Sequence, residues 1–345
     1  MWLKLTKETL FFDWSKFHPG AALLRIPAIA ASLAIGLATG HPRQGVMAAA
    51  GAFSVGFGSF QELRHSRTAP MLLAAIVMCV SSWIGTVAGL WVSATILVCT
   101  LWGFLYAATW TLSPGIVWIS LQGVVWLVIS TAYPQSGLHA LLRGSFVLAG
   151  GLLQMLFVAG SWRIFGFVTP PFGGVSNPDE HESFGAVADA TRQWRTESLR
   201  AALILAVAAT FYRWAALPNG YWIPMTAAIV MKGTFMQTFQ RGIARILGTL
   251  AGAALATLIA AYLRPDPWVL AALVVLFTGL SYLMIYVNYG TFAVCLTAYV
   301  VFLLALAGLP ESAVIAHRSM NTILGGSIAL AIHAVFSPVE KRIQT

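Results

Sequence analysis

The sequence predicts an all-α polytopic membrane protein with about twelve transmembrane helices, arranged as two parallel six-helix repeats. Three observations carry this prediction: an apolar composition, a series of long apolar runs, and landmarks that recur at a constant spacing. Of the 345 residues, 59% are hydrophobic and 9% are charged, whereas soluble domains carry about 25% charged residues. With a mean hydropathy of +0.80, the chain lacks the polar residues that would cover a soluble protein of this size.

The apolar runs are the second observation. A helix needs about 20 mostly apolar residues to cross a bilayer. We expect short or glycine-rich runs, such as 44–60, to be tilted or broken. The predicted spans are 21–39, 44–60, 69–89, 92–109, 114–133, 138–161, 199–216, 220–236, 242–262, 268–287, 289–308 and 312–336.

The third observation is a repeat, because landmarks of the first six spans recur 175 residues later. Several ungapped matches spread along a chain indicate duplication. Six spans per copy return the chain to its starting side, so the repeat is parallel, with a pseudo-twofold axis expected along the membrane normal. The matches are Leu24-Arg25 with Leu199-Arg200, Gly58-Ser59-Phe60 with Gly233-Thr234-Phe235, Gly115 with Gly290, Arg143 with Arg318, and Gly150-Gly151 with Gly325-Gly326.

This organisation divides the chain into five parts. We expect an N-terminal cytoplasmic segment at 1–20, a first repeat at 21–161, a cytoplasmic linker at 162–198, a second repeat at 199–337 and a cytoplasmic C-terminus at 338–345. Residues 183–198 are predicted to form a short polar helix that leads into the second repeat. The N-terminal segment is predicted to lie on the membrane surface, anchored by Trp2, Leu3, Leu10, Phe11, Phe12 and Trp14.

The orientation follows from the basic residues. One set of loops and span ends carries nearly all of them, whereas the opposite loops carry Arg43 and Arg264. This imbalance places both termini in the cytoplasm. The net charge of +9 includes no Lys/Arg-rich run of the kind that binds nucleic acid, so we expect no nucleic-acid partner and membrane lipid as the surroundings.

The segment from Gly220 to Thr249 carries the most specific motif of the chain. It contains Tyr221-Trp222 and Lys232, followed by an Arg241-x-x-x-Arg245-x-x-Gly248-Thr249 run. These residues, with Arg318 and Gly325, resemble the signature of the fusaric acid resistance family, aromatic acid exporter-like membrane proteins. The membrane unit is also similar to that of plant aluminium-activated malate transporters. The resemblance implies export of aromatic carboxylic acids and similar toxic organic anions from bacterial cytoplasm, and therefore a bacterial inner-membrane location.

The basic residues agree with an anion pathway. Arg143 and Arg318 lie roughly 8–9 Å inside the predicted outer ends of their spans. Because they occupy matched repeat positions, we expect them to flank one cavity. The alternatives are that these side chains snorkel to the membrane surface or form structural pairs. Lys232, Arg241 and Arg245 are expected at the inner mouth, where ordinary membrane anchoring is the alternative. The other candidate substrate-binding residues are Tyr221, Trp222 and Thr249.

Acidic residues are absent from the interiors of the predicted spans. Many proton-driven transporters use an intramembrane carboxylate as proton carrier. Proton coupling would therefore depend on histidine, with His139, His317 and His333 as candidates. The alternative is an anion flux that the membrane potential drives outward without a proton site.

We therefore expect an exporter of small organic anions with a pathway between the repeats. An organic-anion channel and a membrane subunit without transport activity remain the alternatives. The sequence contains no metal-ligand spacing, phosphate loop or Ser-His-acid set in a credible context, so we predict neither a cofactor nor an enzymatic activity. The sequence does not decide whether the protein forms a homo-oligomer.

Overall fold

The fold is known from a computed structural model that describes residues 11–166, 187–309 and 311–343. Throughout these residues the chain is helical, with one isolated β-bridge between Leu63 and Ser66. The first half contains η1 (Trp14–Lys16), α2 (Pro19–Leu23), α3 (Ile26–Ala38), α4 (Pro42–Gly56), η2 (Phe57–Phe60), α5 (Thr68–Ala88), α6 (Val92–Ala108), α7 (Pro114–Thr131) and α8 (Gly137–Phe165). The second half contains α9 (Val187–Trp214), α10 (Trp222–Val230), α11 (Phe235–Leu263), α12 (Pro267–Met284), α13 (Tyr289–Leu306) and α14 (Glu311–Ile343).

Each predicted span overlaps at least one of these helices, but the structure divides three of them: 21–39 covers α2 and α3, 44–60 covers α4 and η2, and 220–236 covers α10 and the start of α11. Fewer than twelve of the described helices have the properties of a full crossing. Eight helical segments within the described residues are long and apolar enough to span a membrane, and α6 is a shorter apolar helix. The nine residues of α10 are about 14 Å long, roughly half of a hydrocarbon core. The multi-pass membrane protein is therefore confirmed, whereas the count of about twelve spans stays a prediction.

The predicted short helix at 183–198 differs from the structure. Residues 187–214 form one continuous helix, α9, so the polar stretch and the following apolar span share one axis. The rest of the predicted linker, residues 167–186, lies outside the described residues, as do Trp2, Leu3 and Leu10 of the predicted N-terminal anchor. Of the remaining anchor residues, Phe11, Phe12 and Trp14 are exposed.

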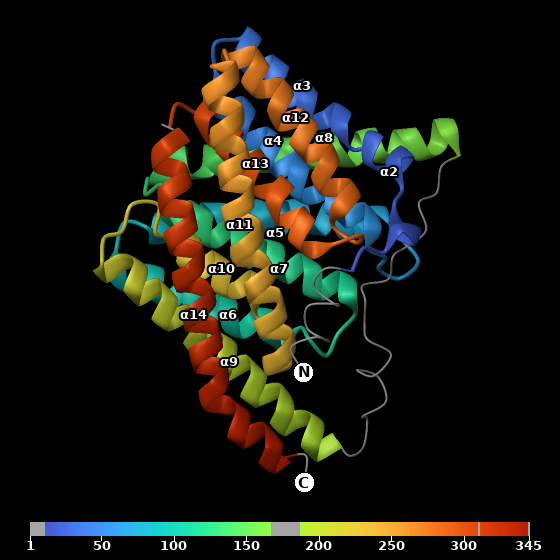
Figure 1. The fold of residues 1–345 in the computed structure, drawn as a ribbon. Helices are drawn as coiled ribbons and strands as arrows, with labels where there is room; N and C mark the ends of the chain where they lie inside the picture. Colours follow the sequence, from blue (N-terminus) through green and yellow to red (C-terminus); the bar gives the residue numbers. More distant parts are fainter. Residues whose placement is uncertain (1–10, 167–186, 310, 344–345) are drawn as a thin grey trace.

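Helix packing follows the same pattern in both halves. Contacts join α3 to α4, α4 to α8, α5 to α7 and α5 to α8, and the helices 175 residues later pair in the same way: α9 with α10, α10 with α14, α11 with α13 and α11 with α14. Figure 1 shows α11 and α14 side by side along one flank. These matched pairs support a duplicated unit, and the parallel repeat itself stays a prediction.

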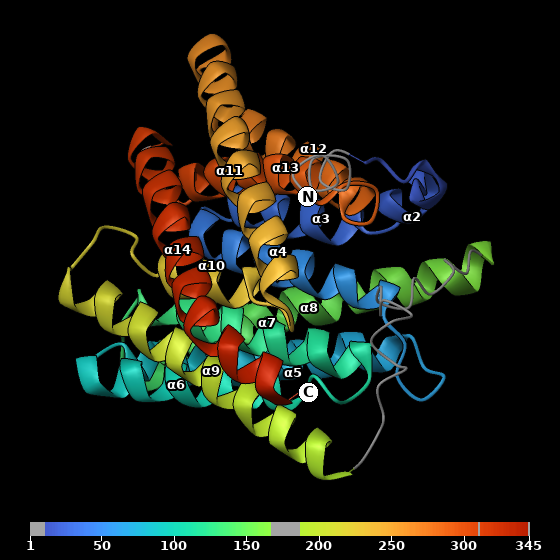
Figure 2. The same ribbon diagram turned by 60° about the horizontal axis from the view of Figure 1, so that its bottom comes forward.

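The two halves also exchange partners. In the first half α6 packs on α9, and in the second α12 packs on α3; Figure 2 shows α6 and α9 lying against each other. One hydrophobic core consequently joins α3 and α4 to α12 and α13, and another joins α6 and α7 to α9 and α10. Both cores cross the predicted boundary between the repeats.

Matched glycines bring matched helices close together. A Cβ atom added to Gly150 of α8 would lie 1.8 Å from the carbonyl oxygen of Ala48 in α4. The same atom on Gly325 of α14 would lie 2.3 Å from the carbonyl oxygen of Ile223 in α10. Both contacts are shorter than any side chain allows, so glycine is required for these helix crossings.

Matched arginines hold the ends of the two short helices. Arg25 donates from Nε to the carbonyl of Gly56 at 3.2 Å, at the end of α4, and to Ser59 Oγ at 2.6 Å. Arg200 donates from Nη2 to the carbonyls of Lys232 and Gly233 at 3.2 and 3.3 Å, beyond the end of α10. Carbonyls at helix C-termini lack helical partners, and each guanidinium supplies donors for them.

Candidate functional site

The centre of the candidate site is Arg318 in α14. Its side chain is 1% exposed, and Cζ lies 4.0 Å from the centre of the Trp222 ring at the start of α10. Trp222 in turn contacts Tyr221, with ring centres 5.0 Å apart. A cation above an indole face gains about 2 kcal/mol when it is shielded from water. The structure thus brings together Arg318, Trp222 and Tyr221, three of the residues singled out in the sequence.

Arg245 joins this centre from α11. It is also 1% exposed, and its guanidinium charge lies close enough to that of Arg318 for the two to repel each other. We expected Arg245 at the inner mouth and Arg318 near the outer side. They lie on neighbouring helices, because α11 and α14 run in opposite directions and pack together. Gly326 of α14 lies against Ile246 of α11, so Arg318 is about 13 Å nearer to the start of α14 than the level of Arg245. The inner and outer placement of the two arginines stays a prediction.

The hydrogen-bond donors of these two arginines lack partners. Within the described part of the chain, Nε, Nη1 and Nη2 of Arg318 and Nε and Nη1 of Arg245 are buried without an acceptor. The hydroxyls of Thr249 and Thr226 and the Oδ1 atom of Asn321 are buried without partners as well. A buried charge costs several kcal/mol unless it is paired, so this arrangement is suited to an anion that accepts these hydrogen bonds.

The remaining basic candidates precede Arg245 in the chain: Arg241 lies one turn earlier in α11, and Lys232 lies just before this helix. Arg241 donates from Nε to the carbonyl of Ile229 at 3.1 Å, and its Cζ lies 4.1 Å from the Tyr289 ring centre. Tyr289 also interacts electrostatically with Arg245. The carbonyl of Lys232 accepts a hydrogen bond from Arg200. Arg241 is therefore connected to the centre through Tyr289, whereas Lys232 belongs to the junction between α10 and α11.

Arg143 approaches from the first half. Its Cζ lies 4.5 Å from the ring centre of Tyr133, and the Tyr133 and Tyr221 rings are 6.3 Å apart. Arg143 and Arg318 are thus linked by a chain of aromatic rings. We call this series of arginine and aromatic side chains the arginine–aromatic file; in order it consists of Arg241, Tyr289, Arg245, Arg318, Trp222, Tyr221, Tyr133 and Arg143. Arg245 and Arg318 are related in it by charge repulsion between neighbouring helices, and the other neighbours by ring or side-chain interactions.

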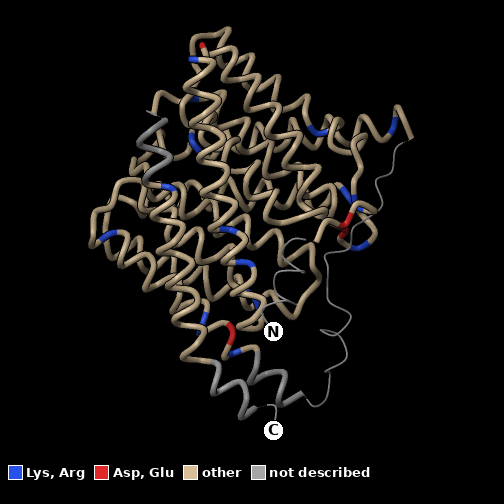
Figure 3. Tube along the Cα trace, in the orientation of Figure 1, with Lys and Arg blue, Asp and Glu red and all other residues tan. Residues whose placement is uncertain are grey.

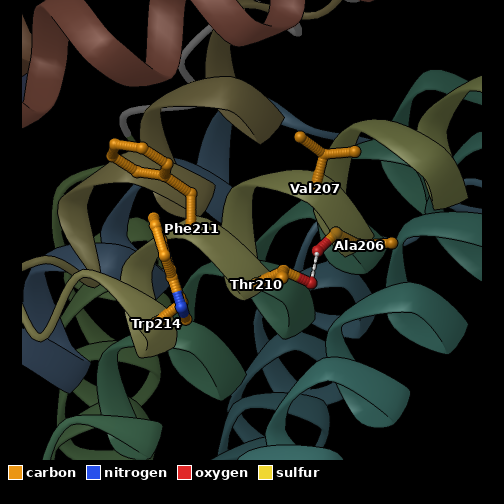
Figure 4. Close-up of a pocket in the computed structure, with 5 residues that line it drawn as sticks. All are labelled: Ala206, Val207, Thr210, Phe211 and Trp214. Carbon is orange, nitrogen blue, oxygen red and sulfur yellow. Dashed lines mark hydrogen bonds between the residues drawn. The ribbon is translucent and has the colours of Figure 1, made fainter.

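One cavity lies at the Arg143 end of this file. It has a volume of about 180 Å³ and is lined by Tyr133, Tyr212 and Tyr221, with the turn between α9 and α10. A larger hollow of about 300 Å³ lies elsewhere, on the surface of α9. Figure 4 shows that all five residues lining it belong to this helix; Thr210 already donates to the carbonyl of Ala206, and Trp214 is 82% exposed. No charged residue lines that hollow.

The three histidine candidates have different surroundings. His139 is exposed and His317 is half-buried, with Nδ1 3.4 Å from Asn219 Nδ2. His333 is fully buried, and its Nε2 lies 3.3 Å from Nη1 of Arg200. Because arginine only donates hydrogen bonds, Nε2 of His333 is the acceptor in this contact. None of the three belongs to the arginine–aromatic file, and proton coupling through them stays a prediction.

No described carboxylate is paired with Arg245 or Arg318. Among residues whose side chains the structure describes, the carboxylates are Asp13, Glu62, Glu197 and Asp266. In that part of the chain none of them pairs with Arg245 or Arg318, and Figure 3 shows how few acidic positions accompany the basic ones. The same residues contain no group of three His, Cys, Asp or Glu side chains that could hold a metal ion.

Sequence reasoning missed Tyr133, Tyr289 and Asn321. Tyr133 and Tyr289 lie near helix ends, where tyrosine is common because it is enriched at membrane interfaces, so neither stood out in the sequence. Asn321 is a single uncharged residue within a helix. Asn321 carried one usable signal, because it follows Arg318 by three residues and therefore shares its helix face. Tyr133 and Tyr289 belong to the arginine–aromatic file only because helices that are far apart in the sequence contact each other.

Comparisons with known proteins agree with the motif in the second half. Residues 205–332 match the family model described as fusaric acid resistance protein-like. That range contains all the candidate site residues except Arg143. No solved structure matches the chain.

Three curated relatives cover a similar portion of the chain. It is 33% identical over 135 residues to uncharacterized protein slr1298 of Synechocystis sp., 32% over 130 residues to uncharacterized protein YhfK of Escherichia coli, and 30% over 134 residues to uncharacterized protein ORF2 of Neisseria gonorrhoeae. These matches cover 39%, 38% and 39% of the chain but 18%, 18% and 32% of the relatives. The aligned region is thus a minor part of each relative.

Proposed function

From the fusaric acid resistance protein-like domain at residues 205–332, we propose that this membrane protein is a transporter that exports organic anions from the bacterial cytoplasm through the inner membrane. Both termini lie in the cytoplasm in this proposal, so Arg241 faces the inner side and Arg143 the outer side. Aromatic carboxylic acids are the proposed substrates. The arginine–aromatic file is the proposed pathway.

The observation that supports the proposal most is the pair of buried guanidiniums of Arg318 and Arg245, of which Arg318 has no acceptor for any side-chain nitrogen and Arg245 none for Nε and Nη1 among the described residues. Repulsion between them and the loss of hydration both disfavour this arrangement. A carboxylate between the two guanidiniums would remove both costs, because it accepts charge-assisted hydrogen bonds from each of them. The ring of Trp222, 4.0 Å from Arg318, offers an aromatic substrate a stacking partner.

The file also suggests how an anion passes through. Arg241 attracts the anion from the cytoplasm, and Arg245 with Arg318 binds it in the interior. Arg143 receives it on the outer side. Thr249, one helical turn beyond Arg245 on the same face, supplies a hydroxyl that is buried without a partner among the described residues. Each step replaces one guanidinium partner by the next, so the anion is never without a counter-charge.

The test is transport in proteoliposomes loaded with radiolabelled benzoate. We expect Arg318→Ala and Arg245→Ala each to reduce benzoate efflux at least about tenfold, because loss of a charged hydrogen-bond partner costs 1.4 kcal/mol or more. Arg163→Ala is the matched control, since Arg163 is an exposed arginine in the last turn of α8. Its efflux should equal that of the wild type.

Efflux that is unchanged in both buried-arginine variants would exclude the proposed pathway. An organic-anion channel would instead show unitary currents in planar bilayers, with the same dependence on Arg318. Absence of flux for a broad panel of acids in the wild type would favour a membrane subunit without transport activity.

A further inference from the structure

The cavity of about 180 Å³ at the Arg143 end of the file is separated from Arg318 by two side chains, those of Tyr221 and Trp222. Tyr133 and Asn219 at the cavity are half-buried, whereas Tyr221 is only 2% exposed. Behind Tyr221 lies Trp222, which contacts Arg318. Tyr221 thus has the cavity on one side and the buried anion site on the other.

The chain that carries Tyr221 is a strained turn, residues 215–221, which we call the 215–221 turn. Ala216 and Asn219 have φ values of 47° and 53°, in the left-handed region that costs conformational free energy for residues other than glycine. Pro218 and Ala216 are exposed. A strained and partly exposed segment between two helices is suited to a change of conformation, because another arrangement relieves the strain.

Asn321 fastens this turn to the helix that carries Arg318. Its Nδ2 atom donates to the carbonyl oxygens of Pro218 and Asn219, each at 3.1 Å. Both partners are acceptors, which determines the orientation of the amide and leaves Oδ1 without a partner among the described residues. Asn321 is fully buried and follows Arg318 by three residues on the same face of α14.

We infer that Tyr221 is the outer gate of the pathway and that Asn321 is its latch. This inference rests on the proposed function. In the closed state described here, Tyr221 contacts Tyr133 and covers the buried site. When an anion binds Arg318, it lies beside Asn321 on α14 and competes for its amide, so the 215–221 turn is released and Tyr221 swings into the cavity. The anion then reaches Arg143.

Cysteine accessibility tests the gate without any substrate. Cys79, Cys99 and Cys295 are first replaced by alanine. Asn219→Cys then reports on the cavity, and Thr226→Cys, one turn beyond Trp222 and fully buried, reports on the space behind the gate. An anionic, membrane-impermeant methanethiosulfonate reagent is applied to sealed cells or inverted vesicles, on whichever side labels Asn219→Cys.

We expect Thr226→Cys to be labelled at least tenfold faster when combined with Tyr221→Ala or with Asn321→Ala. Tyr212→Ala is the matched control, because Tyr212 is another buried tyrosine that lines the same cavity; it should leave the labelling of Thr226→Cys slow. A monodisperse size-exclusion peak and a cooperative thermal unfolding transition of each purified variant in detergent show that it is folded, and rapid labelling of Asn219→Cys in each background shows that the reagent reaches the cavity.

Continued protection of Thr226→Cys in both the Tyr221→Ala and the Asn321→Ala backgrounds would overturn the gate, as would equal acceleration by Tyr212→Ala. Because labelling requires no transport, this outcome is distinct from failure of the proposed function, which the benzoate efflux of Arg318→Ala decides. A working gate in a protein that moves no anion would contradict the function and leave the gate standing.

Discussion

Arg25 and Arg318 are equally buried, each with 1% of its surface exposed, but their surroundings are opposite. Arg25 donates to the carbonyls of Ala21 and Gly56 and to Ser59, and its Cζ lies 3.9 Å from the Phe60 ring centre. All three side-chain nitrogens of Arg318 lack an acceptor within the described residues. Burial by itself therefore does not distinguish a structural arginine from a functional one, whereas the partners do.

At the residue scale this contrast predicts opposite effects on stability. Arg25→Met should lower the free energy of unfolding by about 3 kcal/mol, because carbonyls lose their donors. Arg318→Met should leave it unchanged or raise it by about 1–4 kcal/mol, since an apolar side chain of similar size avoids the cost of an unpaired buried charge. Denaturant unfolding of the purified protein in detergent measures both. A clear loss of stability in Arg318→Met would show that Arg318 is structural.

At the scale of the elements, the short helix α10 is the part that sequence reasoning described least well. A full span was expected at 220–236, and the structure has nine helical residues that are almost entirely buried. This half-length helix places the start of α10, with Tyr221 and Trp222, in the interior beside Arg318. Such helices are tolerated at membrane depth only where protein surrounds them.

Close packing of α10 against α14 predicts a specific sensitivity. Gly325→Ala should destabilise the protein by about 1–3 kcal/mol, because its Cβ would overlap the carbonyl of Ile223 and move α14 away from Trp222. Benzoate efflux should fall with it. Gly160→Ala in α8 is the control, since a Cβ there meets no atom within 4 Å, and it should add up to about 1 kcal/mol of helix stability. Equal thermal unfolding temperatures for the two variants would contradict this packing role.

At the scale of the whole molecule, the charge distribution bears on the driving force. The carboxylates whose side chains are described do not pair with Arg245 or Arg318. An anion that leaves an inside-negative compartment is driven outward by about 2.3 kcal/mol per charge per 100 mV. The proposed export of a monoanion therefore needs no proton.

This distribution predicts electrogenic transport. In proteoliposomes with a potassium-diffusion potential of about 100 mV, benzoate should reach an equilibrium ratio of about fiftyfold across the membrane. A protonophore should not change the ratio while valinomycin holds the potential. Transport that requires a pH gradient at zero potential would instead indicate proton coupling, for which His317 and His333 would then be the first residues to substitute.

The sequence by itself determined the class of this protein and the location of its helices. Membrane helices satisfy their own backbone hydrogen bonds, so apolar runs of sufficient length predict them without reference to other parts of the chain. The motif around Tyr221, Trp222, Arg241 and Arg245 could also be recognised, because its residues lie close together in the sequence. It predicted the basic and aromatic character of the candidate site.

Only the tertiary structure decided how these residues meet. The sequence separated Arg245 and Arg318 into an inner and an outer group, because depth along a single span was all that it could supply. Antiparallel packing of α11 on α14 places them on neighbouring helices within range of charge repulsion, and the contact of Tyr133 with Tyr221 links Arg318 to Arg143 across the two halves. Such contacts join residues that are far apart in the chain, and they depend on the shapes of whole helices, which no local pattern contains.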